Sequence, residues 1–522
     1  MSLEAFLHNL HFDVEKASPP DWEVDWADAP LAYKLYRDRP VFPLSMEMPL
    51  TLEEGATPSS PDYDRIGHFL WYVFGLTQVS QTLGSADQAD LMQSFRRFAP
   101  SGGALYPNEL YVYLKMEELP AGVYHYDVAH HRLVLLREGN FDEYIEQALG
   151  NRCDISSCFG TVFVSTMFWK NFYKYNNFSY RLQGLDAGVL IGQLLEVAKR
   201  FGFTSMVYFQ FLDRAINHLL GLSEEEESTY AMIPLSVEPI HSFANVGNTG
   251  ELVSSEELYR ELTTIQCNHY VRSLTIKEYP MLIKMNAASM MESTESFRPM
   301  KAMKGRNCEG IEIALPSTKR LSYDLASVCR KRFSPEMDFV LGKVSQTQLA
   351  TLLQEAMASF SYRNDLDETD TKQNPRVSLY GCLYNVEDIP DGAYQYDSMD
   401  HVLRQIQPGD HRIPLQYGMS LDNVNLQQIP LCLHVAGNKD HYKPELGYRG
   451  YRIQQMEAGM LVQRLLIAAS ALGMNGHPLL GFDVNVCDEI YKMGNHQGKT
   501  SLIQIPIGPY RQRPWLKGSL RS

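Results

Sequence analysis

The sequence is poor in the features that mark secreted or membrane proteins. Its eight cysteines are scattered, with no CxxC pair, at positions 153, 158, 267, 308, 329, 382, 432 and 487. A disulfide framework and a zinc or other metal site are therefore not expected, and the pattern fits a reducing cytoplasm. No run of 18 apolar residues occurs, so no membrane-spanning helix is expected. The first residues also lack the basic and apolar regions of a signal peptide.

Positive charge is scarce as well. The chain has 47 Lys and Arg against 62 Asp and Glu, a net charge of −15. Such a surface repels nucleic acids and anionic membranes, so neither is expected as a main partner. Hydrophobic residues make up 44% and charged residues 21%, as in ordinary globular proteins. A chain of 522 residues is too long for one core and fits two domains of about 250 residues each.

Three landmarks occur twice at nearly one spacing. Residues 182–203 return in altered form as residues 453–474, at an offset of 271, with Ala187-Gly188 matched by Ala458-Gly459. The sequence GVYHYD at 122–127 returns as GAYQYD at 392–397, and Ile233-Pro234 returns as Ile505-Pro506. This period is far too long for a solenoid or propeller repeat. We interpret it as one domain present twice.

The repeat predicts the organisation of the chain. We expect a leader at 1–60 wrapping the first domain, a first domain at 61–245, a Met-rich connector at 246–310 and a second domain at 311–522. Residue periodicity predicts helices at 66–76 and 345–358, strands at 110–114, 161–165 and 380–384, and a hairpin at 124–135. This mixture indicates an α+β or α/β class. The connector's methionines fit either a partly ordered crossover or a lid that contacts substrate.

Residues 182–203 and 453–474 are apolar on nearly all sides, which predicts two buried helices. In a duplicated chain, such a helix most simply packs against its own counterpart. The two domains would then form a pseudo-two-fold dimer within one polypeptide. The alternative is that each helix is only the centre of its own domain.

The most specific motif is RFAPSGGALYPNEL at 97–110. Pro100 fixes the backbone, and Gly102 and Gly103 remove the side chains that would keep a flat ligand away. The second copy lacks this element and reads NPRVSLYG at 374–381. The motif indicates a turn that meets a planar cofactor, or simply a tight turn before a strand.

The second copy has basic residues that the first copy lacks. Arg332 and Ser334 lie in CRKRFSP at 329–335, and Arg511 and Arg513 lie in IPIGPYRQR at 505–513. Such side chains can clamp a phosphate, although they could also form a solvated basic cluster. A ring-type turn in one copy and phosphate-type residues in the other predict a single composite site at the junction.

These residues resemble the nitroreductase superfamily and, within it, the SagB/ThcOx-type dehydrogenases. The resemblance covers nearly the whole chain. It rests on DWADAPLAYKLY at 25–36, on the R-x-x-P-S-x-G-A-L-Y-P-x-E signature at 97–109, and on the G-x-Y-x-Y-D hairpin at 122–127. It implies an α+β fold of two tandem nitroreductase-like domains that form an intrachain pseudo-dimer and bind FMN at their interface.

The resemblance also implies roles for individual residues. The expected FMN contacts are Arg97, Pro100, Ser101, Gly102 and Gly103 from the first domain, and Arg332, Ser334, Gly473, Gly476, Arg511 and Arg513 from the second. Lys174 and Tyr175 match a Lys-Tyr pair that is linked to proton removal in azoline oxidases, whereas the second copy has Glu445 and Leu446. A lysine kept from water can have a lowered pKa and act as a base. The alternative is a surface lysine beside a packed tyrosine.

The leading hypothesis is an FMN-dependent oxidoreductase that dehydrogenates an azoline, or a related C–N or C–C bond, in a peptide or small natural product. Biosynthetic enzymes are candidate partners, and further homodimerisation is left open. An NAD(P)H-dependent nitro or quinone reductase is one alternative, and a flavin-free scaffold subunit of a biosynthetic complex is another. Peptide-modifying members of the family carry a winged-helix clamp domain that a 60-residue leader cannot form, which makes a peptide substrate less directly implied than FMN.

Overall fold

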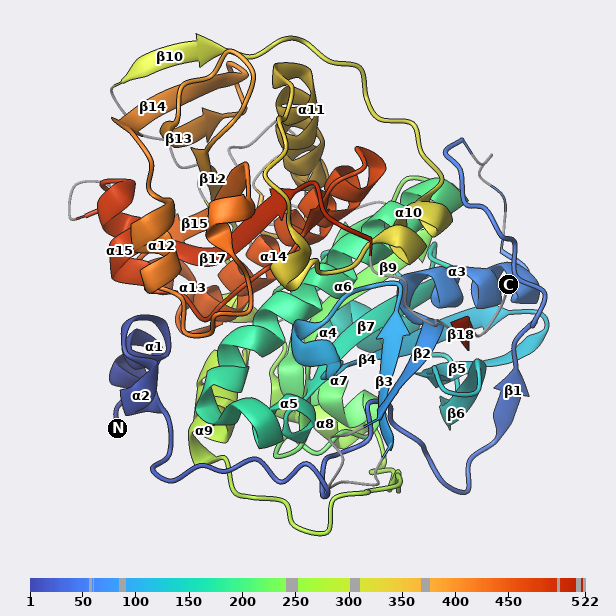
Figure 1. Cartoon of the computed structure of the whole chain (residues 1–522). Helices are drawn as coiled ribbons and strands as arrows, with labels where there is room; N and C mark the ends of the chain where they lie inside the picture. Colours follow the sequence, from blue (N-terminus) through green and yellow to red (C-terminus); the bar gives the residue numbers. More distant parts are fainter. Residues whose placement is uncertain are drawn as a thin grey trace.

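The computed structural model describes residues 1–55, 59, 61–83, 91–240, 252–300, 310–367, 376–494, 498–512 and 518–519. Two sheets, each accompanied by helices, lie on either side of a central pair of long helices (Figure 1). The fold is α+β, with mainly antiparallel strand pairing.

The first half contains an 8-stranded sheet in the order β1-β6-β5-β4-β7-β9-β8-β11. Its strands from this half are β1 (Val41–Pro43), β4 (Asn108–Met116), β5 (Leu119–Asp127), β6 (Arg132–Glu138), β7 (Gly160–Met167), β8 (Thr204–Val207) and β9 (Glu227–Ser236). Its helices are α3 (Tyr63–Phe74), α4 (Asp142–Ala148), α5 (Trp169–Tyr175), α6 (Ser179–Phe201) and α7 (Asp213–Leu220). The predicted strands and hairpin of this half are therefore present.

The second half contains a 7-stranded sheet in the order β10-β14-β13-β12-β15-β17-β16, which repeats the first order strand by strand. Its strands are β10 (Ile311–Ala314), β12 (Ser378–Leu383), β13 (Gly392–Asp397), β14 (Val402–Pro408), β15 (Leu431–Asn438), β16 (Asn475–Gly476) and β17 (Lys499–Gly508). Its helices are α10 (Leu325–Lys331), α11 (Gln346–Met357), α12 (Arg412–Tyr417), α13 (Lys443–Leu446), α14 (Arg449–Ala471) and α15 (Val484–Ile490). One strand of this half, β11 (Arg363–Asn364), joins the first sheet by parallel pairing with β8.

The central helices α6 and α14 pack directly against each other, as predicted from their apolar sequences. Their backbones come closest at Gly188 and Gly459. A Cβ added at Gly188 would lie 1.9 Å from the carbonyl oxygen of Met456, and one at Gly459 would lie 2.1 Å from that of Leu185. Only glycine fits at both places, which explains why the Ala-Gly pair is present in both copies.

The leader is more structured than predicted. It contains two helices, α1 (Leu3–Phe12) and α2 (Val14–Ala17). Helix α1 contacts α15 of the second half and, through Phe6, Tyr180 of α6, whereas β1 further along the leader pairs with β6 in the first sheet. The His11 side chain of α1 hydrogen-bonds Thr500 at 2.9 Å, and Lys443 forms an ion pair with Glu4 at 2.8 Å. The Ser2 cap and the buried apolar side chains of α1 supply the physical reason for a helix here.

The connector is partly helical, and its roles as a crossover or as a lid both stay predictions. It contains α8 (Ser255–Glu261) and α9 (Pro280–Ser289), and Met285, Met291 and Met300 are buried in the body of the protein. Met303 lies outside the described residues. A third small sheet, in the order β18-β2-β3, contains β18 (Gly518–Ser519), β2 (Leu76–Leu83) and β3 (Leu91–Arg97). The predicted helix at 66–76 therefore ends at Phe74, and β2 begins at Leu76.

Candidate functional site

The Pro-Ser-Gly-Gly turn lies between β3 and β4 and faces the end of α5. Gly103 has φ 64°, in the left-handed region, within a short 3-10 turn at Gly102–Ala104. A Cβ added at Gly103 would lie 2.5 Å from the Tyr175 hydroxyl and 3.1 Å from Lys174 Nζ. The structure therefore brings the turn and the Lys-Tyr pair, two separate predictions, into one place.

A buried carboxylate of α6 holds this turn. The Ser101 hydroxyl donates to Asp186 Oδ2 at 2.6 Å, and the Gly102 N–H donates to Oδ1 at 3.0 Å. Burial raises the pKa of Asp186 to about 6, against the lowering effect of these hydrogen bonds. Within the described part of the chain, this carboxylate forms no salt bridge. Sequence reasoning missed Asp186, although an acidic residue precedes Ala-Gly in both copies and could have revealed it.

The underside of the turn is held by Tyr106 and two buried cations. Arg97 lies between the rings of Phe74 and Tyr106, with its guanidinium carbon 4.0 and 4.6 Å from their centroids. The Arg97 backbone N–H donates to the Tyr106 hydroxyl at 3.0 Å, and Lys170 Nζ donates to the Tyr106 carbonyl at 3.3 Å. Arg97 has no exposed surface, so it supports the turn from behind.

Lys174 is a half-buried ammonium between two aromatic rings. Its Nζ lies 5.4 Å from the centroid of the Trp26 ring and 4.9 Å from that of Tyr175. It has no salt bridge to any residue that the structure describes, and burial lowers its pKa. Burial, with the charge of Asp186 as a lesser cause, raises the pKa of Tyr175 to about 12. Trp26 comes from the leader and was not among the predicted site residues.

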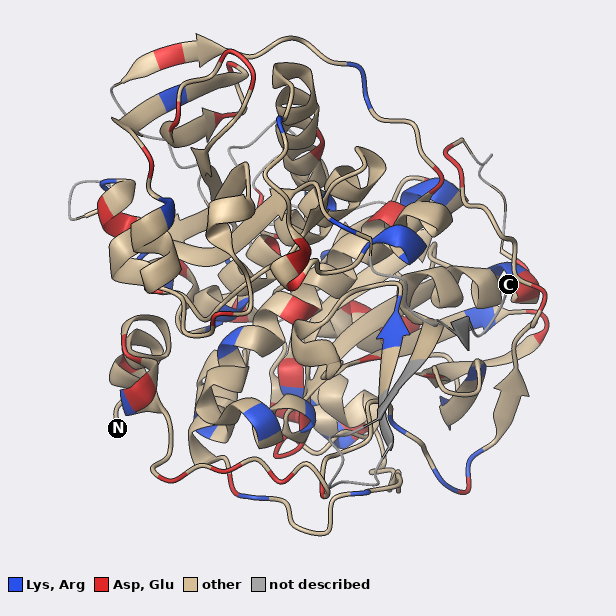
Figure 2. Ribbon diagram, in the orientation of Figure 1, with Lys and Arg blue, Asp and Glu red and all other residues tan. Residues whose placement is uncertain are grey.

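Two arginines from different halves meet beside Tyr106. Arg332 follows α10 in the second half and is buried, and its burial, together with the charge of Arg96, lowers its pKa to about 9. Arg96 comes from β3 of the first half and donates to the Cys329 carbonyl at 3.3 Å. Figure 2 shows these basic ends of β3 and α10 near each other. Neither arginine pairs with a described carboxylate, and Arg332 Nε has no hydrogen-bond partner, which is the electrostatics of an anion site.

The remaining second-half residues gather next to Arg332. The Phe333 N–H donates to Asn475 Oδ1 in β16 at 3.3 Å, and its ring lies 4.7 Å from that of Tyr510. Ser334 and Arg511 are exposed here, and Gly476 lies in β16. Arg513 lies outside the described residues.

Gly473 has a structural role that explains its presence in both copies. It follows α14 with φ 77°, and the Met474 N–H donates back to the Ala469 carbonyl at 2.9 Å. Gly202 follows α6 with φ 70° in the same way. Both glycines therefore end the central helices, because this left-handed position is costly for other residues. The expectation that Gly473 also lines a cofactor ring stays a prediction.

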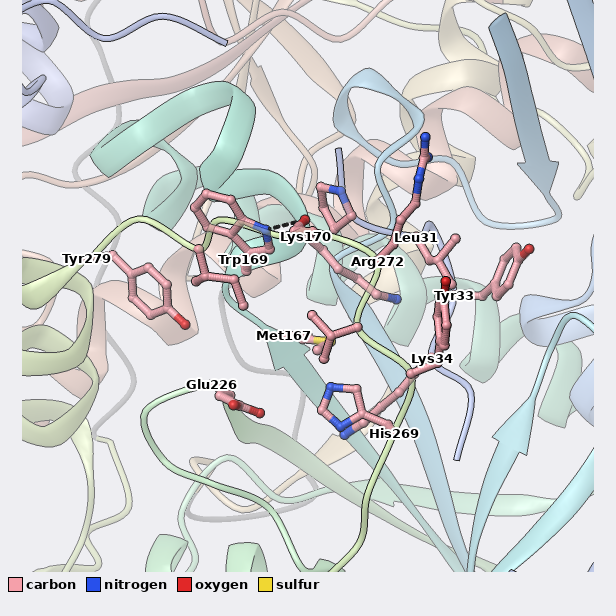
Figure 3. Close-up of a pocket in the computed structure, with 15 residues that line it drawn as sticks. Leu31, Tyr33, Lys34, Met167, Trp169, Lys170, Glu226, His269, Arg272 and Tyr279 are labelled. Atoms are coloured by element: carbon pink, nitrogen blue, oxygen red, sulfur yellow. Dashed lines mark hydrogen bonds between the residues drawn. The ribbon is translucent and has the colours of Figure 1, made fainter. Parts of the chain in front are cut away.

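A separate cavity of about 40 Å³ lies between the leader, α5 and the connector (Figure 3). Its two lysines are already paired, Lys34 with Glu227 at 2.6 Å and Lys170 with Glu109. The Trp169 indole donates to Ser273 at 2.9 Å and ties the connector to α5. These two lysines are thus neutralised by described carboxylates, unlike Arg96 and Arg332.

Two further searches cover only the residues that the structure describes. There, no three His, Cys, Asp or Glu side chains are grouped so as to hold a metal ion. The same residues include no helix with the length and apolar character needed to cross a bilayer.

The model of the nitroreductase family matches residues 69–235, the segment that carries the turn, the Lys-Tyr pair and α6. This segment is a nitroreductase family domain. The predicted membership of the nitroreductase family is thereby confirmed for this segment.

Relatives of this nitroreductase domain are distant. The trifolitoxin-processing protein TfxB of Rhizobium leguminosarum bv. trifolii is 26% identical over 215 residues, 38% of this chain and 56% of that protein. The "Putative nitroreductase MJ1384" of Methanocaldococcus jannaschii is 25% identical over 134 residues, 25% of this chain and 64% of that protein. The chain thus spans less than two thirds of either relative.

A solved structure from Anabaena variabilis, titled a "putative nitroreductase", covers 98% of this chain and 99% of its own, with a TM-score of 0.73 and 19% identity. At this identity the likeness concerns the fold alone. It extends beyond the nitroreductase domain to nearly the whole chain.

Proposed function

We propose that this protein is an FMN-dependent oxidoreductase of the SagB/ThcOx type, with one composite flavin site between its two halves. The observation that carries the proposal is the meeting at Tyr106 of groups from both halves. The Tyr106 N–H donates to Ser101 Oγ at 2.9 Å, and Arg332 of the second half lies within electrostatic range of the Tyr106 hydroxyl. A ligand with a planar ring and a phosphate would match these two ends.

The described residues fit FMN by their chemistry. Half-buried Arg96 and buried Arg332 supply positive charge without a described carboxylate, and exposed Ser334 and Arg511 lie beside Arg332 for the phosphate. Arg513 belongs to the same proposal from its sequence position. Pro100, Ser101, Gly102 and Gly103 offer backbone close enough for a flat ring, and Gly476 lies at a sheet edge whose backbone groups could meet ring polar atoms. Arg97 holds the turn rather than the ligand.

The chemistry divides between cofactor and protein. FMN, when bound, supplies a hydride acceptor. Dehydrogenation also releases a proton, and Lys174 Nζ, in its neutral form, is the group placed to take it. Its lowered pKa makes that form more accessible, and the Tyr175 hydroxyl beside Gly103 is positioned to hydrogen-bond the same substrate.

The substrate proposed is an azoline in a peptide or small natural product. The aromatic surroundings of Lys174, formed by Trp26 and Tyr175, suit a planar five-membered ring. The name of TfxB, a trifolitoxin-processing protein, supports a role in natural-product biosynthesis and hence biosynthetic partner enzymes. The nitroreductase name of the Methanocaldococcus relative supports a second candidate, an NAD(P)H-dependent nitro or quinone reductase.

The test begins with the absorption spectrum and the flavin content of the purified chain. We expect about one FMN per chain, reduction by an azoline-containing model peptide under anaerobic conditions, and no rapid bleaching by NAD(P)H. Rapid bleaching by NAD(P)H would favour the reductase. Failure to take up FMN at all would favour a scaffold subunit and would contradict the proposal.

Replacement of Lys174 by Ala separates the base from the binding site. We expect K174A to keep its flavin and to lose about 100-fold or more in turnover, within the range for general base catalysis. Lys284, exposed on α9, provides the matched control K284A with unchanged turnover. Loss of flavin in K174A would instead make this lysine a cofactor ligand.

A further inference from the structure

The two halves place corresponding residues on corresponding elements, so each feature of the proposed flavin site has a counterpart. The offset of 271 carries Asp186 of α6 onto Glu457 of α14. Strand β8, which follows α6, corresponds to β16, which follows α14. Tyr106 stands just before β4, and Arg376 stands just before β12. A second site of the same design would lie where Glu457, β8 and Arg376 meet.

The carboxylates at the two places have different partners. Among the residues that the structure describes, Asp186 accepts hydrogen bonds only from uncharged groups of the Ser101-Gly102 turn. Glu457 is bound by the Arg376 guanidinium, whose Nε lies 2.9 Å from both carboxylate oxygens, and by the Tyr362 hydroxyl at 3.0 Å. Arg376 also binds Asp367 at 2.6 Å. The second place is therefore filled by a cation and an aromatic side chain of the protein itself.

The corresponding edges of the two sheets also differ, because one is open among the described strands and the other is covered by a strand. In the second half, β16 ends its sheet, and no described strand pairs with its outer side. In the first half, the corresponding edge of β8 is covered by β11, with Arg363 opposite Met206 and Asn364 opposite Val207. The backbone groups of β8 that a ligand could reach are thus used in strand pairing.

The carboxylate of Asp365 fixes the segment that carries β11 more firmly. The Asp365 carboxylate accepts the backbone N–H groups of Phe209 at 2.8 Å and Gln210 at 3.0 Å, and it pairs with Arg152 at 3.1 Å. The next residue, Leu366, is fully buried. Residues 362–367 are therefore built into the first half by backbone pairing, ion pairs and apolar packing together.

We propose that the second, pseudo-equivalent flavin site is closed by the chain's own residues 362–367 and Arg376, and that these residues turn it into a joint between the halves. The inference rests on the proposed function for its account of the first site. A ligand entering the second place would have to break the β8–β11 pairing and leave Glu457 buried without a cation, which is strongly unfavourable. Of the two pseudo-equivalent places, one therefore admits a ligand, and the other links the two halves of the chain.

The test counts flavin per chain in the wild type, in Arg376→Met and in the double variant Arg376→Met/Glu457→Met. We expect about one FMN in all three. R376M alone should lower the Tm by about 5 °C or more, without rescue by excess FMN, because it strands a buried carboxylate. The double variant should recover most of that loss. Two FMN per wild-type chain, or loss of flavin in R376M, would overturn the proposal.

Hydrogen exchange separates this inference from the proposed function. If the wild type took up no flavin, the proposed function would fail, but the closure could still be judged. Slow exchange at the backbone N–H groups of residues 363–367 would support a permanent joint. Exchange as fast as that of exposed loops would show that the segment opens, and the closure would be refuted.

Discussion

The acidic residues of the two central helices occupy matching places and have opposite surroundings. Asp186 is buried against a turn that offers it no positive charge, and its pKa is raised to about 6. The Glu457 carboxylate, in contrast, is paired with the Arg376 guanidinium and accepts a hydrogen bond from the Tyr362 hydroxyl. Uncompensated buried charge is unfavourable for folding and is typical of functional sites, whereas paired charge is typical of structure. The comparison therefore favours Asp186 as part of a functional site and Glu457 as part of a structural ion pair.

The short helices that precede the two central helices also differ in the residues at their ends and in the pairing of their lysines. Helix α5 ends in Lys174 and Tyr175 beside the turn, and α13 ends in Glu445 and Leu446. Lys174 lacks a described carboxylate partner, whereas Lys443 of α13 is paired with Glu4 of the leader. The half that contains the turn thus also contains a lysine that no described carboxylate pairs with.

The largest expected effect comes from disrupting the close crossing of α6 and α14, to which both halves contribute. Gly459→Val places a side chain 2.1 Å from the Leu185 carbonyl oxygen, so α6 and α14 must separate. We expect a loss of about 3 kcal/mol or more in the free energy of unfolding, and loss of flavin with it. Urea unfolding and the flavin content measure both. The control Gly473→Ala meets no atom within 4 Å and should lose only about 1–2 kcal/mol, from its left-handed backbone. Retention of wild-type stability by G459V would disprove the close helix crossing.

A second test sharpens the contrast between Asp186 and Glu457. The folded-state pKa of Asp186 is raised above its unfolded value, so folding is most favoured when it is protonated, and this contribution is lost as pH rises from about 4 to about 6. Asp186→Asn removes the titration. The stability of the flavin-free wild type should therefore fall relative to D186N by up to about 3 kcal/mol across this window. Urea unfolding at several pH values measures the difference, and a pH-independent difference would contradict the assignment.

A smaller effect is expected at the phosphate end. Arg332→Met removes a buried cation that no described carboxylate pairs with. We expect FMN to bind about 30-fold more weakly, since a charged hydrogen bond contributes roughly 2 kcal/mol. Fluorescence titration of flavin-free protein measures the affinity. Arg330→Met is the matched control, because Arg330 of α10 donates to the Leu50 carbonyl at 2.6 Å instead. Equal losses in both variants would remove Arg332 from the site.

Much of the architecture could be predicted from local pattern. Alternating residues identified β4, β7 and β12, and the apolar runs identified the two central helices, because these periods are properties of neighbouring residues. Helix α1 was missed, since the burial of four residues against distant parts of the chain, rather than a long periodic run, stabilises it. Strand β11 has only two residues and is defined by its partner β8, which no local pattern reveals.

The sequence by itself determined that three landmarks recur at nearly one spacing, that an Ala-Gly pair occurs in both long apolar segments, and that the turn and the basic segment occur at different places of the chain. These are facts of residue identity and spacing. Only the tertiary structure decided that Asp186 holds the turn, that Arg96 and Arg332 converge, and that β11 covers β8. Each of these contacts joins residues far apart in the chain, and their proximity follows from how α6 and α14 pack, not from any spacing that can be counted along the sequence.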